Sequence, residues 1–347
     1  MLTAEAVKRH ALGCGADLVG IASMDRFDGL PKQVDPRTIC PDAKSMIVMG
    51  FRIFRGTLRG IEEGTFFTSY TLMGVAGMRW VFQPVTLWRF TRFLEDAGHE
   101  SMPIPDNFPW SNIDELDPDE QGQGFIDVNP SAYGRTDGNW SRPVAPDRPA
   151  PDVFFQLRLA AYCAGLGEIG YSGMFLTPEY GPRQMFAAVL TDAELEPDPL
   201  YEGGLCDRCL ECARQCPGKA ISATDTVRVR IAGRELEWAK FDFDACSVAY
   251  HGGSDAHNPF MVSEKDKEGF TRRPYTESKK YKLGPILWNG RALGGMRGCQ
   301  MACMRHLEAQ GKLTNVFHRP FPKRDWYESA ESPLPDTDVR EAGEGRE

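Results

Sequence analysis

The sequence has no uninterrupted apolar run near the length of about 18 residues that marks a membrane-crossing helix. Its N-terminal segment, MLTAEAVKRH, lacks both the apolar core of a signal peptide and a twin-arginine pair. From these absences we expect a soluble, cytoplasmic protein that is not exported and has no membrane partner.

Positive charge is also in short supply, with 40 Lys and Arg residues against 49 Asp and Glu residues and a formal net charge of -9. A nucleic-acid surface normally shows a basic patch, so this balance argues against a nucleic-acid partner and favours a small-molecule substrate. The chain of 347 residues, 41% of them hydrophobic, is long enough for one large domain or two smaller ones.

What the sequence does have is one dense cysteine motif. Residues 206–217 read CDRCLECARQCP, which is C-x2-C-x2-C-x3-C-P without a gap. This is the bacterial ferredoxin signature for an iron–sulfur cluster. The short spacings let Cys206, Cys209 and Cys212 converge from one loop onto one cluster. Pro217 ends that loop, so Cys216 is directed elsewhere, normally to a second cluster.

Zinc sites and disulfide scaffolds are the alternatives for closely spaced cysteines. A zinc ribbon would show two separated C-x2-C pairs, and a disulfide scaffold would be short and secreted. The chain fits neither pattern, and ten cysteines in a cytoplasmic protein favour metal binding over disulfides. Cys14, Cys40 and Cys163 stand apart from the motif, and we interpret them as buried thiols.

A second cluster needs further cysteines, and the sequence supplies Cys246, Cys299 and Cys303. By the reciprocal pattern of two-cluster ferredoxins, we expect Cys303 to complete the first cluster, a 4Fe-4S cluster. Cys216 would then join Cys246 and Cys299 in the second.

The second cluster lacks one ligand, because a full repeat would place a cysteine at position 296, where the chain has Met296. Either this cluster is a three-iron (3Fe-4S) species, or an oxygen or nitrogen ligand fills the corner. His251 and His257 are the candidates for such a ligand. Replacing a thiolate removes negative charge, so the potential of this cluster is expected to rise.

Hydrophobic periodicity predicts a mixed α/β layer ahead of the cysteines. A short amphipathic helix fits residues 3–14, and a long helix interrupted at Pro84 fits residues 69–97. The continuous apolar run at residues 45–51 is typical of a strand buried on both faces. Further strands are expected at residues 17–22 and 185–191, and a hairpin at residues 227–238.

Two segments are irregular. Residues 103–151 contain nine prolines and interspersed aromatics but no sustained periodicity, so we expect a long ordered lid. The acidic residues 326–347 are poor in apolar side chains and are expected to be disordered. Between them, Asp152 has the position of an N-cap for a helix at residues 153–164.

Residues 165–170 read GLGEIG, a formal match to the dinucleotide fingerprint G-x-G-x-x-G. That fingerprint needs a strand before it and a helix after it, whereas here a helical pattern precedes and a turn and a strand follow. We interpret the glycines as places where the backbone closely approaches a flat or bulky group, or as a tight helix-to-strand turn.

Together these features resemble the corrinoid iron–sulfur proteins that include the reductive dehalogenases and epoxyqueuosine reductase. The cysteine motif follows LTD at residues 190–192 at the spacing of that family. The other matching segments are GADLVGIA at 15–22, PDAKSMIV at 41–48, AGLGEIG at 164–170 and LTPEYGPR at 176–183.

The resemblance implies an α+β protein in two parts. A nitroreductase-like α/β core at residues 1–200 would bind cobalamin without its lower base attached, and a ferredoxin-like domain at residues 201–325 would hold two iron–sulfur clusters. An external donor such as ferredoxin or flavodoxin would supply the electrons. The residues implied to contact the corrinoid are Gly165, Gly167, Gly170, Tyr180 and Arg183.

A proton donor is also implied. In epoxyqueuosine reductase a catalytic acid precedes the AGLG segment by about thirteen residues, and that spacing falls on Pro151, one place from Asp152. Asp152 is therefore a candidate acid as well as a helix cap. Tyr162, Tyr171 and Tyr180 are alternative phenolic donors.

The function implied is a cobalamin-dependent oxidoreductase that receives two electrons one at a time through the clusters. Dehalogenation of a small organohalide is favoured over tRNA modification, because the chain is acidic and has no helical-repeat tail. The rival from another class is a non-catalytic electron-transfer protein, although about 200 residues ahead of the cysteines argue against it. A third possibility is an enzyme that uses a flavin, or no further cofactor, in place of cobalamin.

Overall fold

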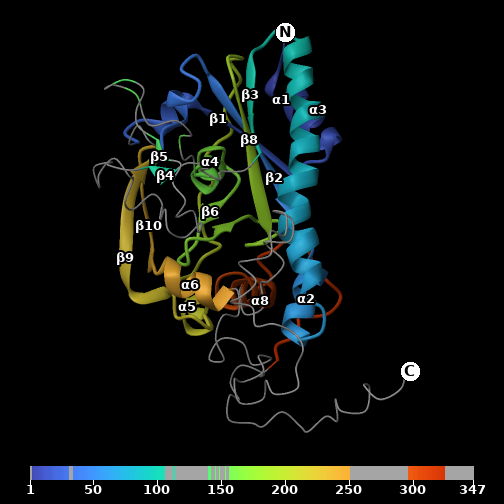
Figure 1. Cartoon of the computed structure of the whole chain (residues 1–347), viewed down its shortest axis with the longest axis vertical. Coiled ribbons are helices and arrows are strands. Elements are labelled where there is room, and N and C mark those ends of the chain that lie inside the picture. Colours follow the sequence, from blue (N-terminus) through green and yellow to red (C-terminus); the bar gives the residue numbers. More distant parts are fainter. Residues whose placement is uncertain are drawn as a thin grey trace.

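The centre of the fold is a four-stranded antiparallel sheet with the strand order β1-β2-β8-β3 (Figure 1). It is seen in a computed structural model that describes residues 2–30, 34–105, 112–113, 140–141, 145, 148, 153, 156–250 and 296–324. The strands are β1 (Leu18–Ser23), β2 (Ser45–Arg52), β8 (Gln184–Thr191) and β3 (Ser101–Ile104).

Strand β2 is covered on both faces, as its apolar run predicts, and only its last residue, Arg52, is exposed. Side chains alternate between the faces of a strand. Met46 and Val48 accordingly pack with helix α4 (Leu157–Cys163), while Ile47 and Met49 pack with α1 (Ala4–Cys14) and α3 (Gln83–Asp96). The sheet is thus the middle layer between two layers of helix.

Helix α1 has the boundaries that its sequence predicts. The Thr3 side chain accepts a hydrogen bond from the N–H of Ala6 at 3.2 Å and caps the N-terminus. Gly15, with φ at 119°, ends the helix in the left-handed conformation that suits glycine. The buried residues Val7 and Ala11 lie one turn apart and face the sheet.

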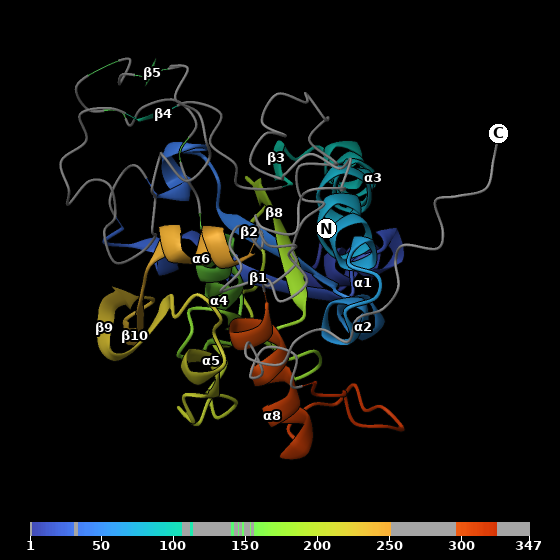
Figure 2. The same cartoon turned by 60° about the horizontal axis from the view of Figure 1, so that its bottom comes forward.

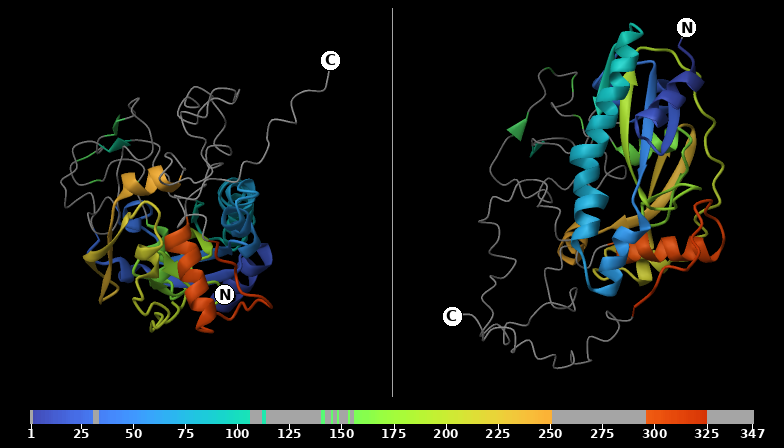
Figure 3. Two further views of the ribbon diagram at one scale, coloured as in Figure 1. Left: turned by 90° about the horizontal axis from the view of Figure 1, so that it is seen from below. Right: turned by 90° about the vertical axis from the view of Figure 1, so that its right-hand side faces the viewer.

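The predicted long helix is present, but its first half has π-helical geometry. Segments η3 (Tyr70–Ala76) and η4 (Met78–Phe82) run directly into α3 (Figure 3). Pro84, near the start of α3, has no N–H to donate back to the preceding turn. Such π turns are frequent at functional sites.

The cysteine motif lies beside a long hairpin of β9 (Ile221–Ile231) and β10 (Arg234–Phe241). Its two turn residues, Ala232 and Gly233, have φ values of 49° and 73°, as a two-residue hairpin turn requires. Helices α5 and α8 lie side by side beyond one end of the sheet (Figures 1 and 2). The helices of this part are α5 (Glu211–Arg214), α6 (Phe243–Tyr250), η8 (Arg297–Ala302) and α8 (Cys303–Ala309).

The remaining elements are short. The segment GLGEIG follows helix α4, contains one short strand and leads into another, so the helix that a dinucleotide site needs after it is absent there. These elements are η1 (Met24–Phe27), η2 (Pro36–Thr38), α2 (Arg55–Glu63), β4 (Asn112–Ile113), β5 (Trp140–Ser141), β6 (Glu168–Ile169) and β7 (Phe175–Leu176).

One predicted helix boundary is wrong. The helix expected at residues 153–164 begins at Leu157, because the Gln156 side chain caps it by accepting from the N–H of Arg158 at 3.4 Å. Asp152 is not its N-cap, and Asp152 itself lies outside the described residues. Most of the expected lid at 103–151 and all of the expected tail at 326–347 also lie outside them.

The observed architecture is a mixture of helix and sheet, in agreement with the predicted class. Within the described ranges, no helix combines the length and the apolar composition that crossing a lipid bilayer requires.

Candidate functional site

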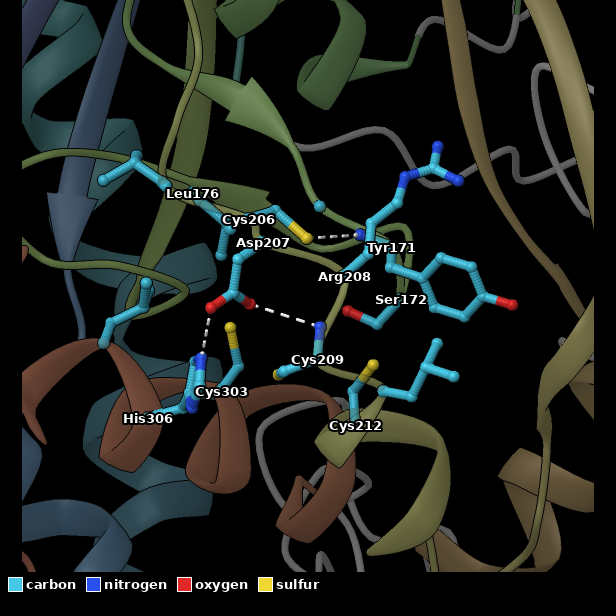
Figure 4. Close-up of a pocket in the computed structure, with 14 residues that line it drawn as sticks. Tyr171, Ser172, Leu176, Cys206, Asp207, Arg208, Cys209, Cys212, Cys303 and His306 are labelled. Carbon is cyan, nitrogen blue, oxygen red and sulfur yellow. Dashed lines mark hydrogen bonds and ion pairs between the residues drawn. The ribbon is translucent and has the colours of Figure 1, made fainter. Parts of the chain in front are cut away.

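Four cysteines from two distant parts of the chain line one pocket. Cys206, Cys209 and Cys212 come from the motif loop and the start of α5, and Cys303 comes from the first turn of α8. Figure 4 shows their side chains around a common space. We call these four residues the first cysteine site. They are the four that the two-cluster pattern groups together.

The loop reaches this shape through its backbone. Arg208 and Leu210 have φ values of 56° and 62°, so two left-handed residues alternate with the cysteines and curl the chain. The backbone N–H of Tyr171 donates to the Cys206 sulfur at 3.3 Å. Such hydrogen bonds to cysteine sulfur are one means by which proteins set the potential of an iron–sulfur cluster.

Three further cysteines lie near one another: Cys216, Cys246 and Cys299, which we call the second cysteine site. Cys216 and Cys299 belong to one apolar cluster. Helix α6, which carries Cys246, packs so closely against Gly218 that a methyl group added there would lie 2.7 Å from the Cβ of Ala249. The backbone N–H of Ala220 donates to the Cys216 sulfur at 3.4 Å.

The thiols of the second site are partly buried. Burial, followed by the nearby Cys216, raises the pKa of Cys246 to about 11. Burial, followed by Cys246 and Cys216, raises the pKa of Cys299 to about 12. Ionised thiols at this site would repel one another without a compensating positive charge.

The first site has the same electrostatic character. Burial raises the pKa of Cys212 to about 11 and that of Cys303 well above its usual range, and neighbouring cysteines add to both effects. A cationic iron core would offset the repulsion between the thiolates, and its binding would release their protons. The donor set of each site therefore fits an iron–sulfur cluster. All ten cysteines are free thiols, so the disulfide alternative is not observed.

At the rim of the first site, Asp207 accepts hydrogen bonds from two side chains of α8 and the turn after it. His306 Nε2 lies 2.8 Å from Asp207 Oδ2 (Figure 4). Gln310 Nε2 lies 2.7 Å from the same oxygen. The hydrogen bond with His306 is the main reason why the pKa of Asp207 is low. His306 is not predicted from the sequence, although its place three residues after Cys303 puts it on the same helix face.

Two aromatic residues flank the second site. Tyr70 in η3 and Tyr250 in α6 hydrogen-bond to each other, and both lie near Cys299. Tyr250 follows Cys246 by four residues, so the two side chains share one face of α6. Burial raises the pKa of Tyr250 to about 12, so its phenol stays protonated at neutral pH.

A buried carboxylate joins the cysteine-bearing helices to the rest of the fold. Glu62 of α2 has no exposed surface and lies 3.5 Å from Arg297 and 3.4 Å from Arg305. These arginines stand two residues before Cys299 and two residues after Cys303. Glu62 therefore holds the segment that supplies one cysteine to each site, a role that no local sequence pattern announces.

The glycines implied to contact a corrinoid face the protein itself. A methyl group on Gly165 would lie 2.1 Å from the Pro199 carbonyl oxygen, and one on Gly167 would lie 1.9 Å from that of Leu176. On Gly170 it would lie 3.0 Å from the Leu176 side chain. The backbone at these glycines does approach another group closely, as predicted, but that group is a neighbouring segment of the chain. Contact of these glycines with a corrinoid stays a prediction.

Arg183 and Tyr180 lie near the end of β2. Arg183 is buried, and its Nη1 donates to the Ile53 carbonyl at 2.9 Å while its Nη2 donates to Asn315 Oδ1 at 3.0 Å. Burial lowers the pKa of Arg183 to about 10. The Tyr180 ring centre lies 6.0 Å from the Arg183 guanidinium. Arg183 thus fastens the segment after α8 to the sheet, and a cofactor contact at either residue stays a prediction.

The phenolic candidates for a proton donor lie apart. Tyr162 is buried in α4 and hydrogen-bonds with Arg234. The Tyr171 hydroxyl donates to the Ser222 carbonyl at 3.0 Å, beside the first cysteine site. Burial raises the pKa of both phenols. Tyr162 belongs to the apolar cluster that packs on the sheet, and Tyr171 belongs to the cluster that contains Cys212. Asp152, His251 and His257 lie outside the described residues.

Replacing Gly298 with alanine is expected to lower the iron content of the protein. A methyl group there would lie 2.4 Å from the Cys212 carbonyl oxygen and 2.7 Å from the Cys216 nitrogen, so η8 would have to move away from the motif. Iron and sulfide assays after reconstitution measure this. Gly56→Ala is the control, since its methyl group meets nothing within 4 Å. Equal iron in both variants would contradict the prediction.

Cys163 is buried as predicted, whereas Cys14 and Cys40 are only partly buried. Burial raises the pKa of Cys163 from the ordinary value of 9.0 to about 12. The folded state then holds this proton more tightly than the unfolded state does. The resulting stabilisation is complete below pH 9 and is lost as the pH rises toward 12.

We therefore expect iodoacetamide at pH 8 to label Cys163 only after unfolding, because the thiolate is the reactive form. Mass spectrometry of the native and the urea-treated protein measures the labelling. Between pH 9 and 12 the wild type should lose more stability than Cys163→Ala does. Rapid labelling of Cys163 in the folded protein would contradict its burial.

Two groups of cysteines arranged in this way are typical of proteins that carry iron–sulfur clusters. Comparison with known proteins narrows the class. Tetrachloroethene reductive dehalogenase of Desulfitobacterium hafniense is 47% identical over 62 residues, which are 17% of this chain and 11% of that protein. The enzyme of Sulfurospirillum multivorans is 42% identical over 62 residues, 17% of this chain and 12% of that protein.

Solved structures give matches of the same kinds. A catabolic reductive dehalogenase aligns with a TM-score of 0.41 and 19% identity, over 71% of this chain and 28% of that one. Epoxyqueuosine reductase from Bacillus subtilis aligns with a TM-score of 0.44 and 15% identity, over 89% of this chain and 82% of that one. No family model matches. Both groups that the motifs resemble are thus among the matches, and the sequence matches over 62 residues confirm the resemblance to the reductive dehalogenases. The match spans only about a tenth of the curated relatives' length.

Proposed function

We propose that this chain is an iron–sulfur reductase that works with cobalamin and removes halogen from a small organohalide. The observation that carries the proposal is the meeting of Cys303 with the three cysteines of the motif loop in one pocket. The similarity to tetrachloroethene reductive dehalogenases supports the reaction class. Cobalamin is part of the proposal because the corrinoid iron–sulfur proteins that the sequence resembles use it.

In this proposal the first cysteine site holds a 4Fe-4S cluster, and the second holds a cluster with Cys216, Cys246 and Cys299 as ligands. The N–H groups of Tyr171 and Ala220 donate to sulfur at the first and second site, respectively, and stabilise the thiolates. The cysteine-bearing part, residues 201–325, is the ferredoxin-like domain, and residues 1–200 are the nitroreductase-like core.

Electrons would enter from a donor such as ferredoxin or flavodoxin at the first site, because Asp207 and Arg208 at its rim are exposed. When bound, the cofactors supply single electrons and the low-valent cobalt that breaks the carbon–halogen bond. The chain itself would contribute the cysteine ligands, a partly buried second site and a protonated side chain. Asp152, Tyr162 and Tyr171 are the candidates for that proton donor.

The test is an anaerobic assay of protein reconstituted with iron, sulfide and cobalamin and reduced by an artificial donor. We expect bromide release from a bromophenol and no change in an epoxyqueuosine-containing tRNA stem-loop. Protein without cobalamin is the control. Activity on the stem-loop alone would favour the epoxyqueuosine reductase alternative. Redox-active clusters with neither reaction and no corrinoid bound would point to an electron-transfer protein.

A further inference from the structure

We propose that the cluster at the second cysteine site has only three thiolate ligands, and that its fourth iron is exchangeable. The inference rests on the iron–sulfur part of the proposed function and goes beyond it, because it assigns a labile metal position within the protein. It does not depend on the substrate or on cobalamin.

No cysteine remains to act as a fourth ligand. The chain has ten, of which four line the first site and three form the second. The other three lie elsewhere. Cys14 ends α1 and its carbonyl accepts from Thr86, Cys40 lies on the loop before β2, and the Cys163 sulfur lies 3.9 Å from the Arg26 carbonyl. A fourth thiolate is therefore not available to the second site.

Met296 occupies the place where C-x2-C spacing would put the missing cysteine. It has a φ of 70°, an uncommon conformation for a residue other than glycine, and its carbonyl accepts from the N–H groups of Gln300 and Met301. Its side chain packs into an apolar cluster that includes Tyr70 and Tyr250. Met296 thus lies directly before η8, at the position expected for the missing cysteine, and its thioether is surrounded by apolar and aromatic groups.

The neighbouring phenols do not replace the thiolate. Tyr70 and Tyr250 hydrogen-bond to each other, so their hydroxyl groups are engaged within the pair. A neutral thioether is a soft and weak ligand compared with a thiolate. Among the described residues, neither Met296 nor these two phenols then supplies a strong ligand, and the proposal leaves the remaining iron to the cluster sulfides and one exchangeable small ligand.

Such an iron is lost on oxidation. Ferricyanide takes one electron from a 4Fe-4S cluster of charge 2+, which becomes a 3Fe-4S cluster of charge 1+ and releases one Fe2+, so charge is conserved. Added Fe2+ and a reductant such as dithionite reverse the step. The four-thiolate cluster of the first site resists it, because each of its irons has a protein ligand.

The experiment is ferricyanide titration of the fully reconstituted chain, followed by electron paramagnetic resonance and an assay of released Fe2+. We expect about one Fe2+ released per chain and a three-iron signal, with about seven irons retained by the two clusters. Met296→Cys supplies the missing thiolate and should abolish both effects. Met296→Leu keeps the volume without sulfur and should behave like the wild type.

Three results would overturn the inference. They are no Fe2+ release from the wild type, a changed signal in Met296→Leu that identifies the thioether as a ligand, and nitrogen coupling in pulsed resonance spectra that identifies a histidine. A chain that binds no iron and sulfide at all would instead contradict the proposed function.

Discussion

Replacing Cys303 with alanine is expected to remove the first cluster and leave the second in place. Cys303 supplies the ligand that the motif loop lacks, and the first site opens to the surface at Asp207 and Arg208. Water and oxidants would reach an iron left without a thiolate there. We expect about four irons to be lost per chain, as one 4Fe-4S cluster holds.

The matched experiment is Cys299→Ala, which should remove the second cluster and leave the first. Cys163→Ala, a buried cysteine that belongs to neither site, is the control and should keep all the iron. Iron content and the resonance spectrum of the reduced protein distinguish the variants. If Cys303→Ala removed the signal of the second cluster and spared the first, the assignment of the two residues would have to be exchanged.

Replacing Glu62 with alanine is expected to destabilise the protein by about 3–5 kcal/mol, because the change leaves the buried Arg297 and the partly buried Arg305 without their carboxylate. Arg297 is only 6% exposed, so water does not take over the role of Glu62. The arginines flank Cys299 and Cys303, so both clusters should assemble more slowly as well. Urea unfolding and the rate of reconstitution measure the two effects.

Glu63 provides a control at the next position. It pairs with the exposed side chains of Arg59 and Arg324, and ion pairs to exposed side chains contribute little to stability. Glu63→Ala should therefore change neither stability nor cluster assembly appreciably. Equal effects at the two positions would show that the buried ion pairs of Glu62 do not hold the cysteine-bearing helices.

The sheet and its helices could be predicted because their signals are local. The apolar run at 45–51, the Thr3 and Gly15 caps and the turn at Ala232 and Gly233 each act over a few residues. The start of α4 could not be placed, because Gln156 is a weak capping signal next to Asp152.

The first cysteine site could be predicted from the motif and from the reciprocal pattern, and the structure brings its four residues together. Other contacts between segments far apart in sequence could not be predicted, because no motif marks the residues that make them. Glu62 and its arginines are separated by more than 200 residues, and His306 meets Asp207 only when α8 packs beside the motif loop. The left-handed backbone at Met296 likewise follows from tertiary packing.

The most direct test of the account is an anaerobic count of iron, acid-labile sulfide and cobalt per chain in the reconstituted protein. We expect about seven or eight irons with a similar amount of sulfide, as two clusters require, and about one cobalamin. Zinc in the cysteine sites without sulfide, or iron confined to a single cluster, would contradict the account.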